Sequence, residues 1–241
     1  MPRPDASAKI AAAAPKNSNR ALLAILVTAA IVAGIAVAVF VAVGSSRTSP
    51  TVTSGVPKGA TALGGPIVLN PDAPAGVPVL DLYEDPQCPA CKVFEDNYGA
   101  TVNDLVKTNK AKVRVHTLSF LDSNLKNDSS LRGANAAMCA ADQGRFREYV
   151  SATYAAQPEV EGTGYTDAQL ESFASKVGVA DLATWKTCQS RLTYKAHVQA
   201  VQVNATKDGV TGSPTVRLNG TDVKLTGKPQ DLVDAIQAAT K

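Results

Sequence analysis

The 241-residue sequence contains few of the residues that build metal centres, with four cysteines and two histidines. A structural zinc site usually needs two pairs of closely spaced Cys or His ligands. Cys88 and Cys91 form one such pair, but Cys139, Cys188 and both histidines stand alone in the sequence. The sequence therefore disfavours a metal site, and it gives no reason to expect a cofactor.

Basic residues are also scarce in the part of the chain that can fold. Residues 1–65 contain six Lys or Arg against one acidic residue, whereas residues 66–241 contain 18 against 20. A nucleic-acid-binding domain carries clustered cationic side chains on its folded surface. The sequence therefore argues against a nucleic-acid partner.

Charged residues are absent from residues 21–43, a continuous apolar stretch of 23 residues. At about 1.5 Å per residue, such a helix can cross a bilayer core about 30 Å thick. Four Lys or Arg and one acid precede it, so residues 1–20 are predicted to be a cytoplasmic tail. We predict a single-pass transmembrane helix that anchors the chain in the cell membrane, with the C-terminal part outside the cytoplasm. A cleaved signal peptide is the alternative, although its apolar region usually has about 7–15 residues.

Residues 44–65 have the composition of a tether. Gly, Ser, Thr and Pro fill 15 of these 22 positions, and no aromatic residue occurs there. Such a segment cannot bury enough apolar surface to fold, which predicts a flexible linker. The remaining residues 66–241 have an ordinary length for one domain.

Apolar periodicity in this domain predicts strands and helices in the order of a mixed α/β sheet with an inserted helical block. On the helix after the first strand, Val93 and Phe94 begin a stripe that should face the core. Asn219-Gly220 between two short apolar runs predicts a two-residue hairpin. The predicted elements are a strand at 77–83, a helix from about 91, a strand at 112–118, helices within about 128–206, hairpin strands at 215–218 and 221–225, and a helix at about 229–239.

The Cys88-Pro89-Ala90-Cys91 motif directly follows the first predicted strand, where a helix begins. A thiolate performs disulfide exchange, and a Cys at a helix N-terminus gains from unpaired amides and the positive end of the helix dipole. The spacing lets Cys91 reach the Cys88 sulfur one turn later, so the pair can cycle between dithiol and disulfide. Pro89 suits the first turn of a helix. A zinc half-site and a purely structural bridge are the alternatives.

The run Tyr83-Glu-Asp-Pro-Gln-Cys-Pro-Ala-Cys91, the helical insertion and the run Thr211-Gly-Ser-Pro-Thr215 resemble the DsbA-type thiol-disulfide oxidoreductases, a thioredoxin-like family with membrane-anchored bacterial forms. The resemblance covers the chain from about residue 66. It implies a thioredoxin-like fold with an inserted helical domain, and catalysis by the paired cysteines. It also implies that Pro214 is cis and that the backbone of Ser213 pairs with an extended substrate peptide.

The resemblance further implies a biological role. The chain would introduce disulfides into exported proteins with reduced cysteines, and a DsbB-like or VKOR-like membrane partner would reoxidise it. A reductase or isomerase with the same site is one alternative, because direction depends on the reduction potential. A thioredoxin-fold module that binds a partner without turnover is the other.

This sequence departs from the family pattern at two places. Many relatives carry an acid six residues before the first Cys that assists proton movement, and Leu82 stands there instead. Asp81, Glu84 and Asp85 lie nearby, and the sequence does not decide between them. The Pro89-Ala90 dipeptide also lacks the His that stabilises the thiolate in strongly oxidising relatives, which predicts a less oxidising potential.

Cys139 and Cys188 fall on helices predicted within the inserted block. In an oxidising compartment an even cysteine count favours pairing, so we predict a structural disulfide between them. The alternative is two buried reduced thiols. His116, at the end of a strand, and His197, within a helix, are predicted to be structural.

Overall fold

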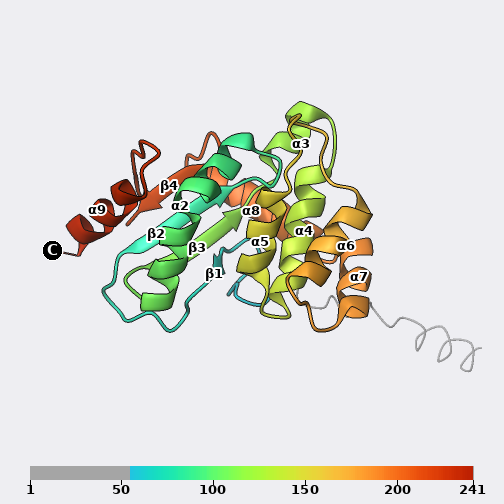
Figure 1. Cartoon of the computed structure of the whole chain (residues 1–241), viewed down its shortest axis with the longest axis horizontal. Coiled ribbons are helices and arrows are strands. Elements are labelled where there is room, and N and C mark those ends of the chain that lie inside the picture. The colour runs from blue at the N-terminus through green and yellow to red at the C-terminus, as the bar shows by residue number, and fades with distance from the viewer. Residues whose placement is uncertain (1–54, 241) are drawn as a thin grey trace, which may run out of the picture. The chain divides into compact units, whose positions relative to one another are not determined.

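The computed structural model describes residues 55–240, so the predicted cytoplasmic tail and transmembrane helix lie outside the described residues. Within that range, no helix is both long enough and apolar enough to cross a membrane. A five-stranded mixed sheet organises this part of the chain, with spatial order β1-β3-β2-β4-β5 (Figure 1). β2 and β3 are parallel, and the other neighbours are antiparallel. The predicted α/β class is confirmed. The strands are β1 (Ile67–Val68), β2 (Val79–Glu84), β3 (Lys112–Thr117), β4 (Thr215–Leu218) and β5 (Thr221–Asp222).

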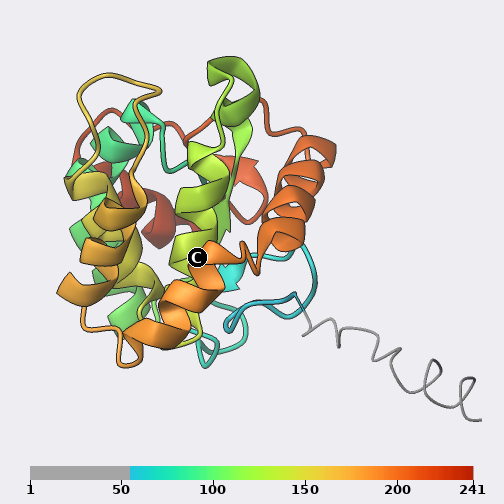
Figure 2. The ribbon, with the colours of Figure 1, turned by 90° about the vertical axis from the view of Figure 1, so that its right-hand side faces the viewer.

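Helices cover the sheet and extend the molecule beyond one side of it. α2 (Pro89–Thr108) packs with α9 (Pro229–Ala239), and α8 (Lys195–Lys207) packs against β3. The helices α3 to α7, called here the helical block, lie beside the sheet (Figures 1 and 2). They are α3 (Phe120–Leu125), α4 (Ser129–Ala141), α5 (Phe146–Ala155), α6 (Asp167–Lys176) and α7 (Leu182–Ser190).

The central strand β2 divides its side chains between two apolar clusters. Leu82 joins Phe94 of α2 in the main core, whereas Tyr83 packs with Val201 of α8. Because successive strand residues point to opposite faces, Glu84 shares its face with Leu82. The strand therefore brings a carboxyl group into the core on the side of α2.

Two local predictions need correction. Val93 is 56% exposed, although it was predicted to face the core with Phe94, which is 4% exposed. Consecutive residues of an α-helix lie about 100° apart around its axis, and here Phe94 takes the buried position while Val93 lies on the exposed side. The hairpin forms as predicted, with left-handed Asn219 and Gly220, but its second strand covers 221–222 instead of 221–225.

Residues 55–65 are ordered, so the predicted linker is too long at its C-terminal end. The buried His197 ring accepts a hydrogen bond from the Gly64 amide through Nδ1 at 3.2 Å and lies 3.1 Å through Nε2 from the Gly65 carbonyl oxygen. Burial lowers the pKa of His197, which favours the neutral ring with one donor and one acceptor. The end of the segment is therefore held by hydrogen bonds between the backbone of Gly64 and Gly65 and side chains of α8, a type of contact that composition does not reveal.

Gly64→Ala is expected to lower the free energy of unfolding by about 2–4 kcal/mol. A left-handed φ costs a non-glycine residue about 1–3 kcal/mol, and overpacking adds about 1–3 kcal/mol. Gly64 has φ +75°, and an added Cβ would lie 2.7 Å from the Ala200 Cβ. Gly76 is the matched control, because it has φ +87° with no atom within 4 Å of an added Cβ. Urea unfolding should show a clearly larger loss of unfolding free energy for Gly64→Ala than for Gly76→Ala. Equal losses in the two variants would contradict the close packing of Gly64 on α8.

Candidate active site

Cys88 lies at the junction of β2 and α2. It is the N-cap residue of α2, and Pro89 occupies the first helical position, where its missing N–H leaves no hydrogen bond unmade. The Cys88 carbonyl accepts hydrogen bonds from the amides of Cys91 and Lys92 at 3.1 and 3.2 Å, which closes the first turn. Cys91 is fully buried, whereas Pro89 and Ala90 are exposed and Cys88 is 6% exposed. A substrate can therefore approach Cys88 but not Cys91.

Electrostatics distinguish the two thiols. A hydrogen bond with the Cys91 thiol, assisted by Ser213 and the amides of the first turn, outweighs burial and lowers the pKa of Cys88 to about 6. Burial raises the pKa of Cys91 well above its usual value. At neutral pH the accessible sulfur is therefore a thiolate and the buried one a thiol, which is the asymmetry that disulfide exchange requires.

The loop before β4 faces the cysteine pair. The Ser213–Pro214 peptide bond is cis, and the Cys88 Sγ lies 3.2 Å from the Ser213 carbonyl oxygen. The structure thus brings Ser213 and Pro214 together with Cys88, although they are more than a hundred residues apart in the chain. Backbone at this position can contact a peptide bound at the Cys88 sulfur.

An open groove starts at the cysteine pair and runs between α2, β4 and the segment after the hairpin. Ala90 and Pro214 form its wall next to the cysteines. Most of its lining residues are apolar in type, although polar atoms make up about half of the lining surface. The exposed Val93 is one of these residues. The other lining residues are Phe94, Asn97, Tyr98, Val216, Val223, Leu225 and Gly227.

Side chains from the region of α5 and α6 hold the loop of residues 85–88 by its carbonyl oxygens. The hydroxyls of Tyr154 and Tyr165 each donate to this loop at 3.2 Å. The Gln157 amide donates two hydrogen bonds, at 3.0 and 3.1 Å, and the second reaches the Cys88 carbonyl. Sequence reasoning missed these residues, because no local pattern connects Gln157 to a loop 69 positions earlier.

The three acids near the pair occupy different environments. Asp81 binds Arg114 and His116, on the opposite face of the sheet from Glu84. Asp85 is buried but accepts three hydrogen bonds, one from a side chain and two from backbone amides. Glu84 is 3% exposed, and its Oε1 has no hydrogen-bond partner among the described residues. Burial raises the pKa of Glu84 to about 8. Of these three acids, Glu84 is the one with an unsatisfied, protonated carboxyl group.

Comparison with known proteins decides the family. The sequence profile of the thioredoxin family matches residues 64–238. The chain belongs to the thioredoxin family. A comparison with curated proteins finds no match.

Solved structures similar to this thioredoxin-family chain come from several bacteria. Reduced DsbA from Mycobacterium tuberculosis is 28% identical, with a TM-score of 0.62 over 73% of this chain and 92% of that protein. The disulfide bond oxidoreductase DsbG from the same organism is 27% identical, with a TM-score of 0.62 over 74% and 88%. MdbA, a thiol-disulfide oxidoreductase from Actinomyces oris, is 21% identical with a TM-score of 0.67 over 77% and 93%, which shows the shared fold. The expected resemblance to DsbA-type enzymes is confirmed, and this member of the thioredoxin family is a thiol-disulfide oxidoreductase.

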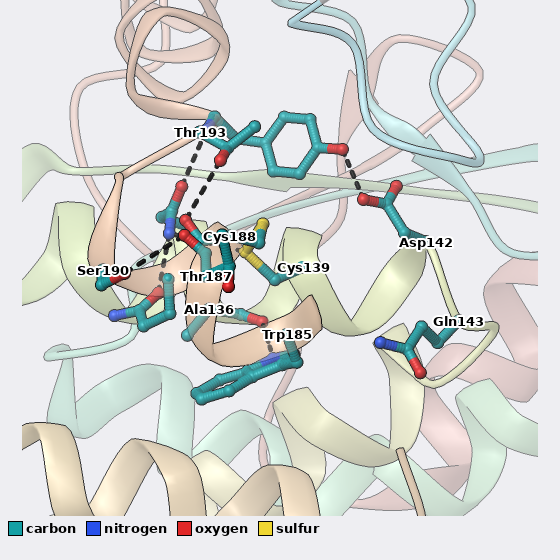
Figure 3. Close-up of a disulfide and its surroundings, with 12 residues drawn as sticks. Ala136, Cys139, Asp142, Gln143, Trp185, Thr187, Cys188, Ser190 and Thr193 are labelled. Atoms are coloured by element: carbon teal, nitrogen blue, oxygen red, sulfur yellow. Dashed lines mark hydrogen bonds between the residues drawn. A yellow bond between two sulfur atoms is a disulfide. The ribbon is translucent and has the colours of Figure 1, made fainter. Parts of the chain in front are cut away.

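The second cysteine pair of this thioredoxin-family chain lies within the helical block. Cys139 of α4 and Cys188 of α7 form a disulfide with a Cα–Cα distance of 5.9 Å, the pairing that the even cysteine count predicts (Figure 3). Trp185 lies beside the bridge and donates through Nε1 to the Ala136 carbonyl at 3.1 Å, a second link between α7 and α4. The bridge therefore joins two helices of the block and involves neither cysteine of the redox motif.

Proposed function

We propose that this chain is an oxidase that introduces disulfides into exported proteins, with Cys88 and Cys91 as its redox pair. The position of the Cys88 sulfur carries the proposal. This sulfur lies at the N-terminus of α2, against the Ser213 carbonyl, and it is the accessible member of the pair. The lowered pKa of Cys88 stabilises the reduced form. A pair whose reduced form is stabilised transfers its disulfide to other thiols more readily.

The reaction follows from the asymmetry of the two thiols. A substrate thiolate attacks the Cys88 Sγ of the oxidised pair, the S–S bond breaks, and the Cys91 sulfur leaves with the electron pair and takes up a proton. A second substrate thiolate then attacks the substrate sulfur of the mixed disulfide, and Cys88 leaves as a thiolate. The substrate loses two electrons and gains a disulfide, while the cysteine pair becomes a dithiol.

The substrate in this proposal is an extended polypeptide segment. The backbone of Ser213, whose carbonyl oxygen lies 3.2 Å from the Cys88 Sγ, supplies its polar contacts next to Cys88. The adjoining groove, whose lining surface is about half apolar and half polar, accepts a side chain of the segment next to its cysteine. Unfolded exported proteins expose such side chains before their cysteines pair.

The location and the redox partner are part of the same proposal. Residues 21–43 anchor the chain in the cell membrane with the catalytic domain outside the cytoplasm, which the apolar length and the preceding cationic residues support. Each turnover leaves the pair reduced, so an electron acceptor must be available. A DsbB-like or VKOR-like membrane protein is proposed for this step.

The equilibrium reduction potential of the Cys88/Cys91 pair tests the direction of the reaction. The full-length chain in mild detergent is titrated against glutathione, and alkylation with peptide mapping follows this pair separately from the Cys139–Cys188 bridge. We expect a value between about −200 and about −120 mV, because the thiolate is stabilised without a neighbouring His. A value near the thioredoxin potential of about −270 mV would establish a reductase instead.

A further inference from the structure

The groove beside Cys88 is bounded by two parts of the chain that are far apart in the sequence. One side is α2, whose residues Ala90, Val93 and Asn97 line the groove at intervals of three and four positions. Another side is the segment of residues 223–227, called here the outer wall, which follows β5 and precedes α9. The width of the groove therefore depends on how the outer wall is held against α2.

The hydroxyl of Tyr98 ties the outer wall to α2. It accepts a hydrogen bond from the Gly227 amide at 2.7 Å and donates one to Asp231 Oδ2 of α9 at 3.1 Å. Both Tyr98 and Gly227 line the groove. The tyrosine is 3% exposed, and its ring stacks on that of Phe94 with the ring centroids 5.2 Å apart. Because packing fixes the ring, the hydroxyl is a rigid point of attachment for the outer wall.

Asp231 draws the end of the outer wall to the same point. Its Oδ2 accepts hydrogen bonds from the Thr226 amide at 2.7 Å, the Thr226 hydroxyl at 2.9 Å and the Lys228 amide at 3.3 Å. Asp231 lies in the first turn of α9, where the helix dipole stabilises a negative charge. The hydrogen bonds from Thr226 lower the pKa of Asp231, so the group is a carboxylate at neutral pH. Hydrogen bonds to a charged acceptor are roughly twice as strong as neutral ones.

The near end of the outer wall is held by the sheet. β5 ends at Asp222, and the amide of Val223 donates to the Val216 carbonyl at 2.9 Å. Residues 223–227 then continue outside any strand or helix, with Val223 and Leu225 half-buried along the groove. The wall is thus attached at its start by the sheet and at its end by the Tyr98 and Asp231 contacts. Loss of the Tyr98 hydroxyl would release its end from α2.

The position of Tyr98 also sets the length of the groove. At about 1.5 Å per helical residue, Ala90 and Tyr98 are about 12 Å apart along α2, the length of three or four residues of an extended chain. We propose that Tyr98 is a specificity-determining positioning residue, which holds the outer wall so that the groove binds the three or four substrate residues next to the reacting cysteine. Polypeptides are then preferred to small thiols. The proposal rests on the redox function proposed above and deepens it, and Tyr98 acts through the wall instead of on the sulfurs.

Exchange of the full-length chain with two synthetic substrates tests the proposal. The long substrate has one cysteine with roughly five uncharged residues on either side, and the short one is cysteine with blocked ends. Each is offered as a thiol to the oxidised chain and as its symmetrical disulfide to the reduced chain, because both reactions pass through the mixed disulfide at Cys88. Tyr98→Phe keeps the ring and should raise the KM of the long substrate about 3- to 10-fold with kcat within about twofold, the range for one lost hydrogen bond. The preference for the long substrate should fall by the same factor.

Tyr149→Phe is the matched control, because the buried Tyr149 hydroxyl donates to the Leu170 carbonyl at 2.9 Å within the helical block. Both variants should lose a similar melting temperature, but Tyr149→Phe should keep the preference for the long substrate. Asp231→Ala should lose it like Tyr98→Phe, whereas Asp231→Asn retains an acceptor oxygen and should keep most of it.

Three results would overturn the proposal: no preference for the long substrate in the wild-type protein, an unchanged preference in Tyr98→Phe, or an equal loss in Tyr149→Phe. The preference is measured in both directions of exchange. A thioredoxin-like reduction potential would therefore refute the oxidase and leave the role of Tyr98 standing.

Discussion

Disulfide exchange by the full-length chain is expected to fall about 10⁴-fold or more when Cys88 is replaced by serine, as for the loss of other nucleophiles. Serine has nearly the same size, but its hydroxyl is not ionised at neutral pH and cannot form a disulfide. Cys88 is the accessible sulfur, and Cys91 is fully buried. Cys91 therefore cannot replace Cys88 as the sulfur that the substrate thiolate attacks. The rate of oxidation of a reduced, unfolded substrate protein measures the effect.

Cys91→Ser is the matched variant, and it should separate the roles of the two sulfurs. It also lacks the redox disulfide, but it retains the Cys88 thiolate with no neighbour to resolve a mixed disulfide. Incubation with oxidised glutathione should therefore give a stable adduct on Cys91→Ser, visible in the intact mass. Cys88→Ser should give none. Exchange that survives in Cys88→Ser would contradict the assignment, and wild-type protein that binds a substrate without turnover would favour the binding-module alternative.

The sequence predicts well those features that depend on neighbouring residues. Cys88 is at a helix start because a buried strand ends just before it and Pro89 follows it. The hairpin forms because Asn219 and Gly220 both adopt left-handed backbone conformations easily. The placement of Ser213 and Pro214 beside Cys88 was inferred from family resemblance, because no local pattern relates residues so far apart.

Features that depend on long-range packing were missed or left open. Glu84 could not be separated from Asp81 and Asp85 by sequence, because the face of the sheet and the local hydrogen bonds distinguish them. Gln157 gives no signal, since its role depends on the loop that folds against it. The segment at residues 55–65 has the composition of a linker, yet hydrogen bonds to His197 and neighbouring side chains of α8 hold it in place. In each case the deciding contact joins residues distant in the chain.

Replacing Cys139 and Cys188 together by alanine is expected to lower the free energy of unfolding by about 4 kcal/mol, on the basis of chain entropy. The bridge joins positions 49 residues apart, so its removal allows the unfolded chain many more conformations. Cys139 is also 1% exposed, and loss of its sulfur from the core adds to the effect. Urea unfolding under oxidising conditions measures the change.

The same variant should show that the helical block supports the redox site through its own stability. The Cys88 loop is held from this region by Tyr154, Gln157 and Tyr165. Disulfide exchange by the variant should therefore be near normal well below its melting temperature, and on heating it should be lost at a lower temperature than in the wild-type protein. Replacing Cys88 and Cys91 by alanine is the control, because a bridge between them closes a loop of a few residues and contributes much less through chain entropy. Equal stability losses in the two double variants would contradict a structural role for the Cys139–Cys188 bridge. A clearly larger loss in the variant without Cys139 and Cys188 would assign the stabilising role to that pair.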